Sequence, residues 1–218
     1  TFGNRRTTVA TAILFNLIPF YQVSSLLMTI DMPYVACWAL ASWAAVSALH
    51  ARSRRAWALL GAMIAVGFLF KYTMAMIVPG LIGALVASSR AQGAHGRSPR
   101  WVRWAVFGSL IALLGLLPVV FWNAERGWPT VRHLLGHLGV RGGDVPTARE
   151  PWTPKWFFEF VGVQFAMIGP AIALMVRGVR APMRDADSEA DRAEISRRVR
   201  TLVWLGLPLV VFYVLVSL

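Results

Sequence analysis

The chain has 218 residues, of which 57% are hydrophobic and only 15% charged, and its mean hydropathy is +0.57. This composition excludes an ordinary soluble domain and indicates an integral membrane protein. The formal net charge of +12 at pH 7 could indicate a protein that binds nucleic acid. The basic residues stand in short clusters between apolar runs, however, which is typical of cytoplasmic loops, so we exclude nucleic acid as a partner.

Two long apolar runs at the start of the chain are separated by one acidic residue, Asp31. The segments Thr8–Met28 and Pro33–Leu49 contain no charged residue. A hydrocarbon core of ~30 Å needs roughly 20 helical residues to cross, so each run predicts a membrane span, the first bent at Pro19. Asp31 then lies in a turn at a membrane surface.

The next apolar segment, Ala56–Ser88, is too long for one ordinary span and carries a single charge, Lys71. A lysine in the middle of a bilayer is costly, so we expect two short spans with a break at Phe70–Thr73. A fifth span is predicted over Trp104–Phe121 and a sixth over Trp156–Val176.

The polar segments predict three cytoplasmic loops, at residues 50–55, 89–103 and 177–200. They also predict one outer loop, at residues 122–155. Ser188–Val199 is expected to form a short amphipathic helix, and a seventh span to start near Thr201. The expected fold is an all-α polytopic transmembrane bundle of about seven spans, forming one domain over residues 1–218. Because the chain starts at Thr1 and ends in an apolar run, we expect a fragment of a longer protein.

Positive charge is distributed unequally between the two predicted sides. If Arg5 and Arg6 are cytoplasmic and the spans alternate, sixteen of the 22 Lys and Arg residues are cytoplasmic and six are outside, namely Lys71, Arg126, Arg132, Arg141, Arg149 and Lys155. Short basic loops stay in the cytoplasm. We therefore predict a multi-pass protein of the cell membrane, the inner membrane in bacteria, with Asp31, Lys71 and the outer loop on the extracytoplasmic side.

Asp31 and Lys71 are the first candidates for a functional site. Each also has an ordinary structural role, because an Asp caps turns and allows Pro33 to open a helix, and a Lys beside Tyr72 can reach the lipid headgroups. Together they place a carboxylate and an ammonium at similar depth on one side. The ammonium suits a phosphate, and the carboxylate suits a proton or a metal ion.

The outer loop contains further polar candidates. If the segment after Pro129 is helical, His133 and His137 share a face at the i, i+4 spacing that can hold a metal, although no third ligand follows at a diagnostic spacing. Arg132 could contact a phosphate or a lipid headgroup. A divalent metal ion is the one cofactor considered, with Asp31, His133 and His137 as candidate ligands.

The chain contains no glycine-rich phosphate loop, nucleophile elbow or dinucleotide fingerprint, so a membrane enzyme of this kind would need a lipid-borne substrate. Three motifs, in their order and spacing, resemble glycosyltransferase family 39, in particular its bacterial branch of dolichyl-phosphate-mannose-type and aminoarabinose-transferase-type enzymes. They are Asp31–Pro33, Gly67–Thr73 followed by Pro79–Gly80, and Pro118–Trp128 followed by Arg132–His133.

The resemblance implies a GT-C fold that passes a sugar from a polyprenyl-phosphate donor to a lipid, glycan or protein acceptor at the outer membrane face, typically with inversion. It implies a catalytic role for Asp31, and contacts to the donor or its phosphate from Lys71, Tyr72, Asn123, Trp128, Arg132 and His133. Family members usually carry their first catalytic carboxylate in a loop after the first span, upstream of this chain. We therefore expect this segment alone to be inactive.

Two other classes of function remain open at this point. A secondary transporter or flippase would explain lone charges and short spans broken by Gly and Pro, but the polar features gather at one face and no internal repeat is visible. A non-catalytic membrane scaffold would explain the topology and leaves Lys71 without a role.

Overall fold

The computed structural model describes residues 5–27, 29–50, 53–92, 99–137, 142–144, 153–163, 165 and 188–217. Regular structure in these residues is entirely helical, which confirms the all-α class for this part of the chain. The helices are α1 (Arg5–Leu17), α2 (Pro19–Leu26), α3 (Asp31–His50), α4 (Arg54–Phe70), the 3₁₀ helix η1 (Tyr72–Met76), α5 (Ile77–Gln92), α6 (Pro99–Leu114), α7 (Leu117–Glu125), α8 (Pro129–His137) and α10 (Glu189–Ser217). Residues 154–163 are also helical.

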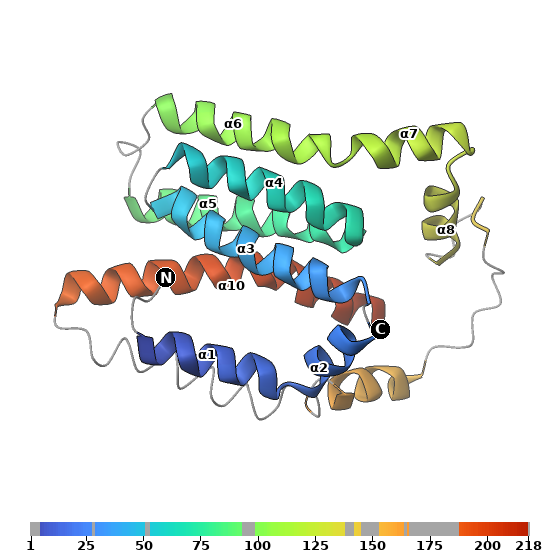
Figure 1. Cartoon of the computed structure of the whole chain (residues 1–218), viewed down its shortest axis with the longest axis horizontal. Helices are drawn as coiled ribbons and strands as arrows, with labels where there is room; N and C mark the ends of the chain where they lie inside the picture. The colour runs from blue at the N-terminus through green and yellow to red at the C-terminus, as the bar shows by residue number, and fades with distance from the viewer. Residues whose placement is uncertain are drawn as a thin grey trace.

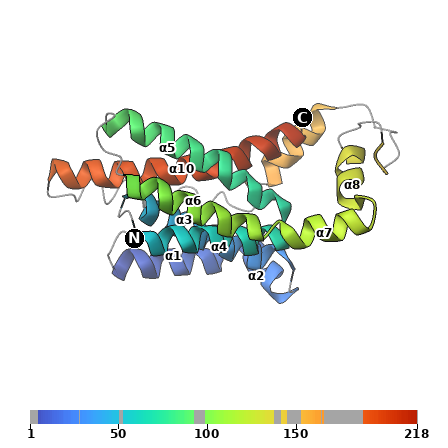
Figure 2. The same cartoon turned by 90° about the horizontal axis from the view of Figure 1, so that it is seen from above.

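The longer helices run side by side along the long axis of the molecule (Figures 1 and 2). Helix α3 packs on α4, α4 on α6, and α5 on α10. One end, which we call the Asp31 end, gathers the start of α3, the end of α4, and α7 with α8 (Figure 1). The opposite His50 end gathers the end of α3 and the starts of α4, α6 and α10. The helix ends described here that border segments predicted to share a membrane side therefore lie at the same end.

Three helical stretches in the described residues are long and apolar enough to cross a membrane: Asp31–His50, Val102–Glu125 and Glu189–Leu215. A shorter apolar helical stretch covers Tyr72–Ser88. These stretches support a membrane protein. The expected number of about seven spans is not established by helix length, and most of the sixth predicted span lies outside the described residues.

Two predicted interruptions coincide with helix ends. The first run is divided between α1 and α2 at Ile18, because Pro19 opens the second helix. The segment Ala56–Ser88 is divided at Lys71, whose backbone is extended, with φ −153° and ψ 124°. The break predicted at Phe70–Thr73 is therefore present.

The fifth predicted span contains an interruption that we did not predict. Helix α6 ends at Leu114 and α7 starts at Leu117. Pro118 has no N–H to donate to the carbonyl of Leu114, four residues earlier, so a continuous helix would lack this bond and suffer a clash. The two helices nevertheless follow one another along the same line (Figure 1).

The stretch Ser188–Val199 was expected to form a short, separate amphipathic helix. The predicted end of this helix is wrong, because the helix continues into the predicted seventh span as the 29-residue helix α10. The Ser188 hydroxyl accepts a bond from Asp191 N at 3.1 Å and donates to the Asp191 carboxylate at 2.7 Å, which caps the helix. Glu194 pairs with Arg197 at 2.8 Å and with Arg198 at 2.7 Å. These pairs one turn apart support a helix where we expected part of a loop.

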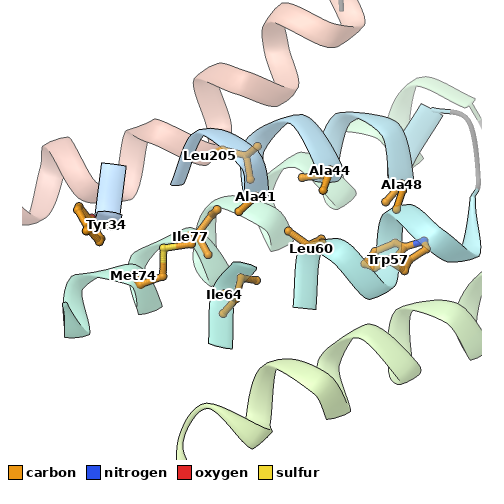
Figure 3. Packing of buried hydrophobic residues seen from close by; sticks show 12 residues of the cluster. Tyr34, Ala41, Ala44, Ala48, Trp57, Leu60, Ile64, Met74, Ile77 and Leu205 are labelled. Carbon is orange, nitrogen blue, oxygen red and sulfur yellow. The ribbon is translucent and has the colours of Figure 1, made fainter. Parts of the chain in front are cut away.

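Small residues let the helices approach closely. Ala41, Ala44 and Ala48 of α3 are fully buried against large side chains of α4, η1, α5 and α10 (Figure 3). Between α4 and α6, a Cβ added to Gly61 would overlap the carbonyl oxygen of Gly108. Such small-residue contacts are characteristic of helix packing in membranes.

Candidate functional site

Asp31 and Lys71 form an ion pair at the Asp31 end. Lys71 Nζ lies 2.7 Å from Asp31 Oδ1, and the two side chains are 35% and 29% exposed respectively. Asp31 is the first residue of α3, where the helix dipole favours a carboxylate. Lys71 is the residue with extended backbone that separates α4 from η1. The helix start and the helix break thus place two residues 40 positions apart in direct contact.

Tyr34 and Thr73 accompany this pair, and neither was predicted from the sequence. The ring of Tyr34 lies one turn beyond Asp31 on α3, with its centroid 5.8 Å from Lys71 Nζ, at the outer limit of a cation–π contact. Tyr34 Oη and Thr73 Oγ1 are both buried. The spacing of three residues after Asp31 was the available signal for Tyr34.

Tyr72 is placed differently from Lys71, its neighbour in the chain. Its ring packs on Phe68, with the ring centroids 5.2 Å apart, and the residue is 47% exposed. Contact with a donor therefore stays a prediction for Tyr72, as does its alternative role as an interfacial anchor.

Asn123 holds the turn between α7 and α8. It is only 2% exposed, and its side-chain amide donates to the carbonyl of Val119 at 2.8 Å while its Oδ1 accepts from Thr130 N at 3.0 Å. Its own carbonyl accepts from Trp128 N at 2.8 Å, the long bond of a Schellman-type helix end. Asn123 therefore orients the start of α8.

The turn itself uses two left-handed residues in succession. Gly127 has φ 68° and Trp128 has φ 63°. Glycine adopts this conformation freely, whereas a tryptophan is strained by about 1–2 kcal/mol. The backbone of Trp128 is held in this conformation by the hydrogen bonds around Asn123, and its side chain is exposed.

Helix α8 confirms the helical register in which His133 and His137 share a face. His133 Nδ1 lies 3.4 Å from Asp144 Oδ1, and Asp144 N donates to the carbonyl of Arg132 at 3.3 Å. The side chain of His137 lies outside the described residues. The residues described include no group of three or more His, Cys, Asp or Glu arranged to hold a metal ion. They do not by themselves form a metal centre.

The candidate residues thus form two groups at one end of the molecule (Figure 1). Asp31 and Lys71 make the first group, and the turn with α8 makes the second. Within the described residues, no hydrogen bond or ion pair joins Asp31 or Lys71 to α7 or α8. Chemically, the first group offers a carboxylate, and an ammonium that has three N–H donors and uses one of them on Asp31.

Residues 1–122 match the family described as dolichyl-phosphate-mannose-protein mannosyltransferase. The chain belongs to this family. The matched region includes Asp31 and Lys71 and confirms the resemblance to glycosyltransferase family 39. A curated relative, the lipid A galacturonosyltransferase RgtD of Rhizobium johnstonii, is 26% identical over 201 residues, which cover 91% of this chain and 37% of the relative. The chain therefore spans well under half of that relative's length. No solved structure matches.

Proposed function

We propose that the protein acts as a membrane glycosyltransferase that moves a sugar from a polyprenyl-phosphate donor to a lipid, glycan or protein acceptor. The observation that carries this proposal is the Asp31–Lys71 ion pair, half-buried at one end of a helical bundle, in the region that matches the family. The named relative acts on lipid A, which favours a lipid acceptor among the three classes. The site would face the extracytoplasmic side of a multi-pass bundle of about seven spans.

In the proposed reaction, an acceptor hydroxyl attacks the anomeric carbon of the donor. The new C–O bond forms as the bond from that carbon to the phosphate oxygen breaks, and polyprenyl phosphate leaves with the bonding electrons. A carboxylate takes the proton of the hydroxyl. Lys71 directs N–H groups at the phosphate, where negative charge grows as the bond breaks. Asp31 holds the ammonium in place and supports the base that we expect upstream of this chain.

The turn and α8 form the proposed cover of the site. Trp128 in the turn and Arg132 on α8 are exposed, and Asn123 fixes the start of α8. We assign contacts with the donor or its phosphate to Trp128, Arg132 and His133, and a positioning role to Asn123. A divalent ion would need ligands beyond the described residues, for instance oxygen atoms of the donor phosphate, and no step above depends on it.

Two substitutions in the full-length protein test the ion pair. Asp31→Asn keeps the shape of the side chain and removes its charge, and Lys71→Ala removes the ammonium. Each should reduce sugar transfer by about 100-fold or more, because loss of one group that stabilises developing charge has an effect of this order. The amount of folded protein in the membrane, measured by fluorescence-detected size exclusion, should stay close to wild type.

The chain offers a matched control for these variants. Lys155 and Glu159 form an exposed ion pair with N···O 3.5 Å, outside the proposed site. Lys155→Ala and Glu159→Gln should leave transfer within about twofold of wild type, since exposed pairs contribute little. Wild-type transfer by both Asp31→Asn and Lys71→Ala would remove this site assignment.

A transporter or flippase is the second candidate function, favoured by one observation. Lys71 occupies an extended break between two helices, and broken helices with a charge at the break form many transport sites. The two functions differ in their product. In proteoliposomes, a transferase joins the labelled sugar covalently to the acceptor, whereas a flippase only moves the intact labelled lipid to the other leaflet.

A further inference from the structure

A pocket whose lining combines polar and apolar residues lies at the His50 end, remote from the Asp31–Lys71 pair. It is formed where the ends of α3 and α5 meet the charged first half of α10 (Figures 1 and 2). It has an empty volume of about 290 Å³, part of it open to solvent, and its polar lining residues are His50, Ser88, Arg197, Arg200 and Thr201. Trp204 lies one turn further along α10.

The lining presents hydrogen-bond donors that the protein does not use fully. Arg197 Nε is buried and makes no hydrogen bond within the described residues. An unpaired buried donor is costly, and Arg197 is one of the residues that line the pocket, so a ligand that reached this N–H would remove that cost. Arg200 is exposed and forms no ion pair within the described part of the chain.

The hydroxyl of Thr201 fixes the orientation of a further donor. Thr201 is 4% exposed and donates from Oγ1 to the carbonyl of Arg197 at 3.1 Å. The 3.2 Å contact between His50 Nε2 and the same oxygen is therefore a bond donated by the imidazole. The other ring nitrogen, Nδ1, is then an acceptor when His50 is neutral and a donor when His50 is charged.

The balance of charge around the pocket is positive. Glu194 is the acidic side chain paired here, and it is shared between Arg197 at 2.8 Å and Arg198 at 2.7 Å. With Arg200, residues 194–200 of α10 thus carry three guanidinium groups and one carboxylate, so two positive charges remain when His50 is neutral. Guanidinium groups bind phosphate through charge-assisted bonds.

The depth of the pocket along α10 indicates where the ligand comes from. Residues 202–217 contain no charged side chain, whereas residues 189–200 are rich in them. The pocket thus lies where an apolar helix becomes polar, which is the level of the lipid headgroups, and an indole at this level is typical of an interface. At this level of the membrane, the phosphates that α10 would meet are those of the lipid headgroups.

We propose that this pocket binds the phosphate group of an anionic phospholipid headgroup. The pocket would lie at the membrane surface opposite the proposed sugar-transfer site. Arg197 and Arg200 bind the phosphate oxygens, and Thr201 with His50 shapes the base of the pocket. The ligand stabilises the packing of α10 on α3 and α5. This site is independent of the proposed glycosyl transfer.

Thermal unfolding of the full-length protein in detergent tests this proposal. After removal of bound lipid, short-chain phosphatidylglycerol should raise the midpoint of unfolding, and phosphatidylcholine at the same concentration should not. Arg200→Gln changes an exposed side chain and should not disturb folding. It should weaken the apparent affinity for phosphatidylglycerol about tenfold, the effect expected for a charge-assisted bond. Arg197→Lys keeps the charge but loses the Nε donor, and should also weaken binding.

The control is Arg192→Gln, which removes a charge from the same polar half of α10 at an exposed position that does not line the pocket. It should bind phosphatidylglycerol like wild type. Inorganic phosphate is the second ligand to test. If it stabilises the wild type as much as the lipid does, and fails to stabilise Arg200→Gln, the phosphate site is supported and its ligand is soluble. Equal stabilisation by phosphatidylglycerol in wild type, Arg200→Gln and Arg197→Lys would overturn the proposal, as would no stabilisation in any of them.

Discussion

At the scale of single residues, Asn123 shows how one buried amide can orient a whole segment. Its side chain bridges the end of α7, through Val119, and the start of α8, through Thr130. It is therefore the residue on which the placement of Trp128, Arg132 and His133 depends. A polar side chain buried to 2% exposure is costly unless both its donor and its acceptor are used, and here both are.

We predict that Asn123→Ala will destabilise this turn by about 1–3 kcal/mol, because it leaves the N–H of Thr130 without its acceptor and removes the additional side-chain bond to the carbonyl of Val119. Hydrogen exchange in residues 119–132 should become faster, while exchange in α3 and α4 stays unchanged. Asn123→Asp is the matched variant, since it retains the acceptor for Thr130 N while a carboxylate oxygen replaces the donor to Val119, and its effect is compared with that of Asn123→Ala at the amide of Thr130. It should give an intermediate effect, and equal exchange in all three proteins would contradict the structural role.

At the scale of helices, the packing of α4 on α6 depends on glycines rather than on large apolar side chains. A Cβ added to Gly108 would lie 2.5 Å from the carbonyl oxygen of Trp57, and one added to Gly115 would lie 2.5 Å from the Cα of Ala65. Both neighbours are backbone atoms that cannot move aside without shifting a helix. The close approach of the two helices therefore requires these residues to have no side chain.

The corresponding prediction is that Gly108→Leu will destabilise the folded protein by about 1–3 kcal/mol or more, the usual range for overpacking. The measurement is the midpoint of thermal unfolding in detergent, which should fall. Gly206→Ala in α10 is the control, because a Cβ there meets nothing within 4 Å and alanine favours a helix more than glycine does. A Gly108→Leu protein as stable as Gly206→Ala would show that the helices do not pack this closely.

The positions of helix breaks could be predicted only where one residue type forces them. Pro19 and Lys71 gave clear signals, one through its missing N–H and the other through the cost of a buried charge. The interruption before Pro118 was missed, although Pro118 carries the same signal as Pro19 through its missing N–H. The continuity of α10 was missed for another reason, since a helix was predicted over Ser188–Val199 but its charges indicated that it ended before the span that starts near Thr201.

At the scale of the whole molecule, the sequence indicated which residues share a side but not which of them touch. Asp31 and Lys71 were expected at similar depth, and their contact follows from the packing of α3 on α4. Tyr34 and Thr73 could not be selected, since a hydroxyl in an apolar run is not unusual until its burial is known. Asp144 likewise reaches His133 only because the chain folds back onto α8.

The separation of the molecule into an Asp31 end and a His50 end leads to the last prediction, which concerns membrane sidedness. Each end carries exposed residues suitable for single-cysteine labelling in a cysteine-free full-length background. Glu125 and Lys155 represent the Asp31 end, and Arg55 and Arg192 represent the His50 end. In intact spheroplasts, a membrane-impermeant maleimide should label Glu125→Cys and Lys155→Cys. It should label Arg55→Cys and Arg192→Cys only after the membrane is permeabilised, because short basic segments remain in the cytoplasm. Labelling of Glu125→Cys and Arg55→Cys from the same side would contradict both this topology and an extracytoplasmic site at Asp31 and Lys71.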